Sequence, residues 1–252
     1  ATEALVAQLK PRKYIRICET GGLVRRDGGI ENYVNLRLDG ARLFASETLQ
    51  PESAAQLRCV RGFLERLSLR ATVQITSATN LLRELFTLKG GGTLIKLGRD
   101  LQVHRDLKRL SRDRLRGLIE RAFDRKLARD FFAGSFNDRH PIKSVIIDPD
   151  YKGVAIVRQV AGLCYLDKFA VRPEARGEGI AHDLWTVLLR RHPRLFWRSR
   201  RENPINAWYY ERASGMLRQD HWVVWWAGLP LPQVRKAIKL ATTIAPTLAA
   251  KE

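Results

Sequence analysis

The amino-acid sequence predicts an α/β (α+β) protein, in which a partial α/β segment precedes a domain with a mixed, mostly antiparallel sheet. Two patterns support this: strands and helices alternate over the first part of the chain, and strands dominate the second part. A third observation is the stretch KFAVRPEARGEGIAHDLW (168–185), where an apolar strand meets a glycine-containing turn and then a helix. Amides at a helix start lack acceptors within the helix and carry partial positive charge, so this turn predicts an anion site.

The first part of the chain, residues 1–98, alternates between strand and helix patterns. Strands are predicted at 12–18, 32–38 and 71–77, and in KGGGTLIKLG after its glycine turn. Helices are predicted at 53–69 and in SATNLLRELFTL, which a Ser or Thr opens as a cap. The turns ETGG and RRDGG separate the early strands. This order indicates part of an α/β layer, and we place the domain boundary after residue 98.

The second part, residues 99–252, begins with a charged stretch and continues into strands. The predicted helices are SRDRLRGLIERAF with Ser111 as its cap, 127–132, 180–191, NPINAWYYERA and 231–240. The predicted strands are 142–148, 152–158, 163–171, LFWRSR and HWVVWWAGL. Large apolar residues alternate onto both faces of the last strand, so we expect a strand that is covered on both sides.

Composition excludes several classes of protein. Hydrophobic residues make up 45% of the 252, which is typical of a globular chain. No apolar run approaches the roughly 20 residues that span a bilayer, and we expect neither a membrane partner nor a secretory signal. The three cysteines, Cys18, Cys59 and Cys164, lie far apart. We therefore predict reduced thiols, a cytoplasmic protein and no metal site.

The net charge of +19 raises the question of nucleic acid binding. However, the basic residues are interleaved with acidic ones, as in RDLKRLSRDRLRGLIERAFDRKLARD. This spacing favours exposed helix faces with pairs four residues apart over a continuous basic stripe. We expect no nucleic acid partner, and a basic protein is equally compatible with an anionic cofactor.

The stretch RGEGIA at 176–181 fits the pattern R-x-x-G-x-A. The pattern alone also fits an ordinary helix start, but here it directly follows an apolar strand. In this setting it resembles motif A of the GNAT N-acetyltransferases, whose loop amides hold the pyrophosphate of acetyl-CoA. Its flanks, YLDKFAV, LFWRSRRENPINAWYYERASG and HWVVWWAGL, resemble the acetyltransferase domain of vertebrate-type N-acetylglutamate synthases and of bifunctional bacterial synthase/kinase proteins.

The first part of the chain is similar to the C-terminal portion of the amino-acid kinase domain in the same family. The similar segments are CETGGLVRRDGGIENYVNL and ITSATNLLRELFTLKGGGTLIKLG, and ELFTLKGGGTLI resembles the family's arginine site. The kinase's lysine-and-glycine phosphate loop is missing, so we predict no kinase activity. A chain that begins at Ala1 with half of this domain suggests a processed or excised segment of a longer protein.

The resemblance implies direct transfer of an acetyl group from acetyl-CoA to the α-amine of L-glutamate, a step of arginine biosynthesis. It places the pyrophosphate on the loop amides and the pantetheine arm along the preceding strand edge. Arg172 could equally be a solvated charge. The expected cofactor-binding residues are Phe169, Ala170, Val171, Arg176, Gly177, Glu178, Gly179, Ile180 and Ala181.

The strand LFWRSR carries two arginines at alternate positions. Alternate residues of a strand share a face, so Arg198 and Arg200 could bind carboxylates together, although an exposed basic strand face would look the same. The resemblance adds four further residues to the glutamate site, of which Asn203 could equally be a helix cap. The four are Lys126, Tyr165, Lys168 and Asn203.

Acetyl transfer also needs proton handling, and neither His182 nor His221 is an evident base. The resemblance points to Tyr209 as the acid that protonates the leaving thiolate, although a core aromatic would fit the run WYY. Tyr165 could position a water that acts as base. An amide at Phe169 or Ala170 could polarise the thioester carbonyl.

Two other functions remain compatible with the sequence. One is a GNAT enzyme for another amine, and the other is a non-catalytic module that senses L-arginine through the kinase-like segment. For the leading interpretation we expect L-glutamate and acetyl-CoA as ligands, L-arginine as an effector, and a homo-oligomer. A eukaryotic source would move the expected location to the mitochondrial matrix.

Overall fold

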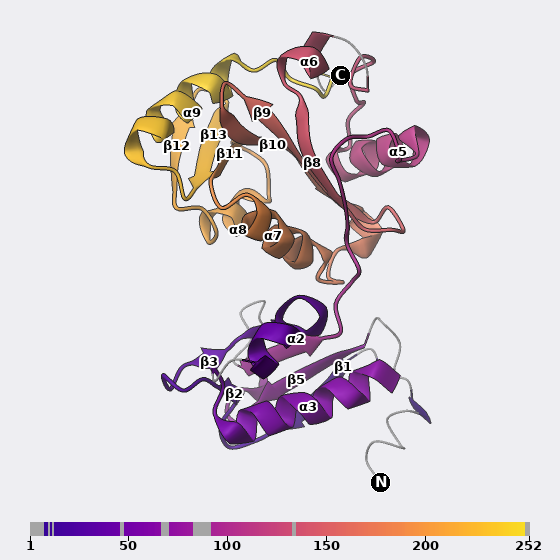
Figure 1. Cartoon of the computed structure of the whole chain (residues 1–252), viewed down its shortest axis with the longest axis vertical. Coiled ribbons are helices and arrows are strands. Elements are labelled where there is room, and N and C mark those ends of the chain that lie inside the picture. Colours follow the sequence, from indigo (N-terminus) through magenta and orange to yellow (C-terminus); the bar gives the residue numbers. More distant parts are fainter. Residues whose placement is uncertain are drawn as a thin grey trace. The chain divides into compact units, whose positions relative to one another are not determined.

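The computed structural model describes residues 8–9, 11, 13–45, 48–66, 71–82, 92–132 and 135–249, without the side chains of 135–136. The chain divides into two compact units, Ala1–Asp100 and Leu101–Glu252 (Figure 1). Within the described residues, no helix is long and apolar enough to cross a membrane.

Unit 1 contains a four-stranded sheet in the order β1-β5-β6-β4. β5 pairs with β1 in parallel and with β6 antiparallel, and β4 pairs with β6 in parallel. The strands are β1 (Lys13–Ile17), β4 (Tyr33–Asn35), β5 (Thr72–Thr76) and β6 (Gly92–Lys96), with a short pair β2 (Leu23–Val24) and β3 (Ile30–Glu31). The helices are α2 (Leu36–Ala45) and α3 (Pro51–Arg66). Apolar residues of these elements form one core cluster, which includes Leu57, Val73 and Ile95.

Unit 2 is built on a seven-stranded sheet in the order β12-β13-β11-β10-β9-β8-β7. All neighbouring strands are antiparallel except β10 and β11. The strands are β7 (Gln102–His104), β8 (Ile142–Ile147), β9 (Gly153–Val160), β10 (Leu163–Val171), β11 (Leu195–Arg200), β12 (Gly215–Gln219) and β13 (Trp222–Ala227). The mixed, mostly antiparallel sheet predicted from the sequence is confirmed.

Helices cover both faces of this sheet (Figure 1). Residues of α7 (Ile180–Arg191) and α8 (Asn206–Tyr210) pack on one face. Residues of α5 (Arg112–Phe123) and α9 (Leu231–Thr243) pack on the other. Two short elements, α6 (Ser135–Arg139) and η1 (Pro173–Ala175), complete the unit. Along β13, Val223 and Trp225 join the first face and Val224 joins the second, as the alternation predicted.

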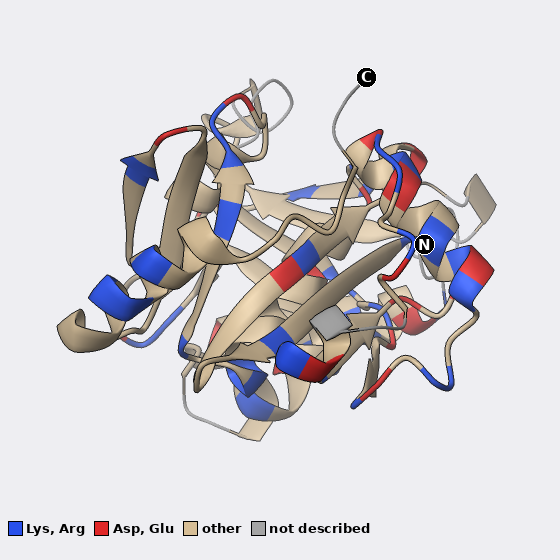
Figure 2. Ribbon diagram, turned by 90° about the horizontal axis from the view of Figure 1, so that it is seen from above, with Lys and Arg blue, Asp and Glu red and all other residues tan. Residues whose placement is uncertain are grey.

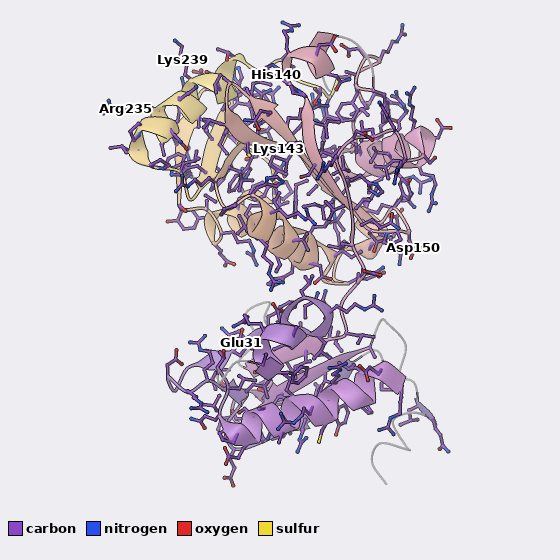
Figure 3. The ribbon with its side chains drawn as sticks, in the orientation of Figure 1. Glu31, His140, Lys143, Asp150, Arg235 and Lys239 are labelled. Atoms are coloured by element: carbon purple, nitrogen blue, oxygen red, sulfur yellow. The ribbon has the colours of Figure 1, made fainter. Side chains whose placement is uncertain are left out.

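Charged residues are spread over the helices and strands, with acidic residues among the basic ones (Figure 2). Pairs four residues apart occur as predicted, at Arg61–Glu65 with 2.8 Å between Nε and Oε1. Arg116 and Glu120 form a second such pair at 3.4 Å. Arg235 and Lys239 project from the exposed side of α9, while Ala237 packs on the sheet (Figure 3).

The structure corrects the strand predicted at 32–38, because only Tyr33–Asn35 is a strand and Leu36 begins α2. The Asn35 side chain accepts hydrogen bonds from the amides of Arg37 (3.1 Å) and Leu38 (3.2 Å). This is helix capping by asparagine. The cap residue was therefore present in the predicted strand and starts a helix there.

The short helix predicted at 127–132 is also wrong. Leu127 instead forms an antiparallel bridge with Leu248, turns follow, and the nearby helix is α6, at 135–139. Pairing with a segment from the far end of the chain competes here with local helix formation. The strands β7 and β12 were not predicted, and α9 extends beyond residue 240 to Thr243. Of the helix predicted at 77–88 and the arginine site at 84–95, residues 83–91 lie outside the described part of the chain.

Candidate active site

The turn between β10 and α7 contains the stretch expected to bind phosphate. After η1, Gly177 has φ 86° and Gly179 has φ 73°, and α7 begins at Ile180 as predicted. Positive φ is the region that glycine adopts without strain, which explains both glycines. Gly179 is the N-cap of α7 and supplies no side-chain cap, so the first helix amides face the turn with their partial positive charge. Arg176 is exposed beside them.

β10 and β11 meet only briefly. Within these two fully described strands, Tyr165 opposite Phe196 is the single parallel register position. Phe169, Ala170 and Val171 lie beyond that position on β10, where β9 still pairs with its other edge. The edge of β10 that faces β11 is therefore not paired by β11 at these residues. Such an edge can pair with an amide-containing chain.

A β-bulge changes the face to which Lys168 belongs. The register with β9 shifts between Leu166 and Lys168, so that Asp167 is the extra residue. In a regular strand, Lys168 would share a face with Leu166, which packs under α7. Lys168 instead contacts Phe131, with 5.2 Å from Nζ to the ring centroid, on the α5 side of the sheet. The bulge thus brings Lys168 to the same face as Tyr165.

A buried charge network surrounds this lysine, and sequence reasoning missed three of its members: Arg158, Asp167 and Thr247. Asp167 accepts from Arg158 Nε at 2.7 Å and from Lys168 Nζ at 2.6 Å, and all three side chains are at most 3% exposed. Lys168 also donates to the Thr247 hydroxyl. Burial alone would raise the pKa of Asp167, but the charges of Lys168 and Arg158 outweigh it and hold the pKa at about 2. Asp167 is therefore ionised at neutral pH.

Arg198 and Arg200 share a face of β11, as the alternation predicted. Both guanidinium groups stack on the ring of Trp222, with 4.1 Å and 4.0 Å to its centroid. Arg198 also donates to the backbone carbonyl of Ala241 in α9. Tyr165 lies on the same face, packed against Phe196. Four of the predicted substrate-binding residues therefore lie on the α5/α9 side of the sheet: Tyr165, Lys168, Arg198 and Arg200.

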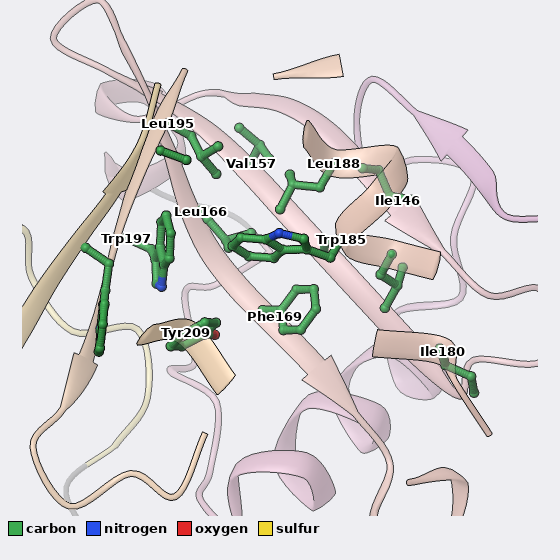
Figure 4. Close-up of a cluster of buried hydrophobic side chains, with 14 of the residues drawn as sticks. Ile146, Val157, Leu166, Phe169, Ile180, Trp185, Leu188, Leu195, Trp197 and Tyr209 are labelled. Carbon is green, nitrogen blue, oxygen red and sulfur yellow. The ribbon is translucent and has the colours of Figure 1, made fainter. Parts of the chain in front are cut away.

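Tyr209 lies on the opposite face, in an aromatic cluster under α7 (Figure 4). Its ring centroid is 5.4 Å from that of Trp197 and 6.4 Å from that of Phe169. Burial raises the pKa of Tyr209 above the usual value for a phenol, and Tyr165 contributes in the same direction. Burial likewise raises the pKa of Tyr165 to about 12, partly offset by Arg198. Both phenols are protonated at neutral pH and can donate protons or hydrogen bonds.

Two further predicted residues, Lys126 and Asn203, contact segments of this site through their backbones: the Lys126 carbonyl accepts from the amide of Ala249 at 2.8 Å, and the Asn203 amide donates to the Arg200 carbonyl at 3.1 Å. The Lys126 side chain is 84% exposed and pairs with Glu120 at 3.4 Å. Asn203 accepts from the amide of Ile205 at 3.2 Å, just before α8 begins. The N-cap of α8 is Ile205, with no side-chain cap, so the helix cap that the sequence allowed at Asn203 is not formed.

The chain is similar to a family profile and to individual proteins whose names all refer to acetylglutamate. The family profile described as NAT, N-acetyltransferase, of N-acetylglutamate synthase matches residues 102–244. A protein named acetylglutamate kinase from Xylella fastidiosa (strain Temecula1) is 35% identical over 249 residues, which cover 98% of this chain and 58% of that protein. The mitochondrial N-acetylglutamate synthase of Homo sapiens is 35% identical over 231 residues, which cover 90% of this chain and 43% of that protein. The chain thus spans less than two thirds of the length of these relatives.

Among solved structures, N-acetylglutamate synthase from Neisseria gonorrhoeae, complexed with coenzyme A and N-acetyl-glutamate, aligns with a TM-score of 0.47. The two chains are 18% identical, and the alignment covers 98% of this chain and 56% of that one.

Proposed function

Because the chain belongs to the N-acetyltransferase family of N-acetylglutamate synthases, we propose that unit 2 transfers an acetyl group from acetyl-CoA to the α-amine of L-glutamate. The observation that carries this proposal is the geometry around β10. Its C-terminal end leads into a glycine-lined helix start suited to phosphates, and its bulge turns Lys168 toward the face that carries Arg198. One strand thus connects a site for an anionic cofactor with cations for a dicarboxylate.

The cofactor would bind at the turn and along the strand. The amides of the 176–181 loop would hold the pyrophosphate, because Gly177 and Gly179 allow close approach and α7 adds its dipole. Arg176 would add a charge. The edge of β10 at Phe169–Val171 would pair with the pantetheine arm, which is supported by the early separation of β11 from β10.

The acceptor's two carboxylates would be bound by the cations on the α5/α9 face of the sheet. Arg198 and Arg200 present planar guanidinium groups whose orientation is fixed by stacking on Trp222. Lys168 would add a point charge, and Tyr165 a hydrogen bond. Lys126 and Asn203 belong to this proposed site on the strength of the family resemblance alone.

The chemistry is a direct displacement within a ternary complex. The α-ammonium of glutamate first loses a proton, for which we propose a water held by Tyr165 as acceptor. The amine then attacks the thioester carbonyl, whose developing charge an amide at Phe169 or Ala170 would stabilise. The new C–N bond forms and the C–S bond breaks. The Tyr209 hydroxyl gives its proton to the CoA thiolate, and the second proton, which the new amide nitrogen loses, returns through solvent to the Tyr209 phenolate. The raised pKa of Tyr209 keeps that proton available.

The test is free-thiol release from acetyl-CoA across a panel of amino acids. We expect L-glutamate to exceed L-glutamine strongly in kcat/KM, because glutamine leaves a guanidinium group of the site without its carboxylate partner, a loss of roughly 2–5 kcal/mol. Arg198→Lys keeps the charge but loses the planar fork, so it should weaken glutamate more than acetyl-CoA. Equal turnover of the two amino acids would instead favour an enzyme for another amine.

Regulation and assembly are further parts of this proposal. A role in arginine biosynthesis, L-arginine as an effector, and a homo-oligomer in the cytoplasm or mitochondrial matrix are proposed from the family resemblance. Addition of L-arginine to the same thiol-release assay tests the effector.

A further inference from the structure

The hydrogen bonds of Lys168 restrict what else it can bind. An ammonium group has three N–H donors. Lys168 Nζ donates to Asp167 Oδ1 at 2.6 Å, to the Asp167 carbonyl at 3.3 Å and to the hydroxyl of Thr247. With three acceptors already in contact, a carboxylate oxygen that reaches this ammonium must replace one of them.

The three acceptors are not equivalent. Two belong to Asp167, the bulged residue, whose carboxylate is also held by Arg158 at 2.7 Å. An ionised pair of this kind is stronger than a bond to a neutral hydroxyl. The third acceptor, Thr247, belongs to the C-terminal segment, residues 244–249, which follows α9. Because α9 also supplies the carbonyl that Arg198 contacts, Thr247 approaches Lys168 from the face that carries the arginines.

The C-terminal segment is held in place by contacts other than the Thr247 hydroxyl. The amide of Ala128 donates to the Thr247 carbonyl at 3.1 Å, and the amide of Ala249 donates to the Lys126 carbonyl at 2.8 Å. Leu248 packs against the apolar cluster beneath α5. The Thr247 hydroxyl also donates to Asp167 Oδ1 at 3.1 Å, so it keeps one hydrogen-bond partner when another acceptor replaces it on Lys168.

We propose that the Thr247 hydroxyl occupies, on Lys168, the position that a carboxylate oxygen of the acceptor takes, so that Thr247 sets the affinity for the acceptor. This inference rests on the proposed function, since it assumes a dicarboxylate acceptor that reaches Lys168. Binding exchanges a neutral acceptor for a charged one, and the displaced hydroxyl retains its bond to Asp167. Thr247 thereby opposes acceptor binding by about the strength of one hydrogen bond.

The experiment compares Thr247→Val, which removes the hydroxyl at nearly constant volume, with Thr247→Ser, which keeps it. Thr243→Val is the matched control, because among the described residues the hydroxyl of that exposed threonine bonds only to carbonyls of its own helix, at 3.3 Å and 3.1 Å. We expect Thr247→Val to lower the KM for L-glutamate about three- to tenfold, the range of a single hydrogen bond, with an unchanged acetyl-CoA KM. Thr247→Ser and Thr243→Val should behave as the wild type.

A second measurement is independent of turnover. Calorimetric titration with N-acetyl-L-glutamate should give a lower Kd for Thr247→Val by the same factor. An unchanged or raised KM and Kd in a folded variant, checked by circular dichroism, would mean that Thr247 positions Lys168 and would overturn the proposal; Thr247→Ala serves if valine prevents folding. Absence of thiol release by the wild type with glutamate is a different result, which refutes the proposed function itself.

Discussion

The Tyr209 hydroxyl belongs to a ring that packs against Trp197, so the same residue contributes to the core and to the proposed chemistry. Tyr209→Phe keeps the ring and removes only the proton donor. Because general acid catalysis contributes ~10²–10⁴-fold, we expect kcat to fall by about that factor while both KM values change little. Steady-state kinetics with both substrates varied gives the three constants.

The neighbouring Tyr210 is a matched control for this substitution, since it is 71% exposed. Tyr210→Phe should leave kcat unchanged. If Tyr209→Phe retains nearly wild-type kcat, the proton comes from water or another group, and Tyr209 is a packing residue. Similar thermal unfolding of both variants ensures that a loss of rate is not a loss of fold.

Residues of the candidate site differ in how far the sequence predicts them. The sequence predicts that Arg198 and Arg200 share a face, because side chains alternate between the faces of a strand and this pattern involves only neighbouring residues. Asp167 and Thr247 do not, because their hydrogen bond joins positions 80 residues apart and depends on a bulge that no local pattern signals. An aspartate beside a lysine in an apolar strand was a possible signal for the buried pair.

At the level of elements, the loop and helix that begin at Gly177 provide a direct test of cofactor binding. Gly179→Val forces a β-branched residue into φ 73° at the start of α7. We expect the KM for acetyl-CoA to rise at least tenfold, about 1.4 kcal/mol, because the loop amides can no longer follow the phosphate oxygens.

A control for this substitution lies in the turn between β9 and β10. Gly162 has φ 86°, and a β-carbon at this position would meet no atom within 4 Å. Gly162→Val therefore introduces similar backbone strain away from the loop. Both variants should lose stability in chemical denaturation. An acetyl-CoA KM that rises equally in both, or in neither, would contradict the phosphate-binding role of the loop.

How accurately an element is predicted depends on how far apart in the sequence the residues lie whose interactions form it. The helix at 180–191 and the strand at 195–200 have the predicted bounds, because periodicity and the glycine turn define them locally. The segment at 127–132 was predicted as a helix because its composition allows one. Its backbone pairs instead with the far end of the chain: the amide of Ala128 donates to the Thr247 carbonyl, and Leu127 forms a bridge with Leu248. Such pairing depends on tertiary structure.

On the scale of the whole molecule, each unit has apolar clusters of its own. The cluster of unit 1 contains residues from Tyr14 to Leu97, whereas the three clusters of unit 2 contain residues from Leu101 onward. Separate cores are typical of domains that can fold independently. Every residue that the proposed mechanism uses also belongs to unit 2, although the sequence similarity to known relatives extends over both units.

We therefore predict that residues 101–252, expressed alone, fold and release thiol from acetyl-CoA in the presence of L-glutamate. The acetyl-CoA KM should remain close to that of the whole chain, because the loop and β10 lie within the fragment. Circular dichroism and a cooperative thermal transition establish the fold, and the assay is the one used for the whole chain. If Tyr209→Phe in the fragment reduces kcat as it does in the whole chain, the same site is active in both. A folded fragment without activity would mean that residues of the first hundred take part in catalysis or support the site, and the assignment of acetyl transfer to unit 2 would be wrong.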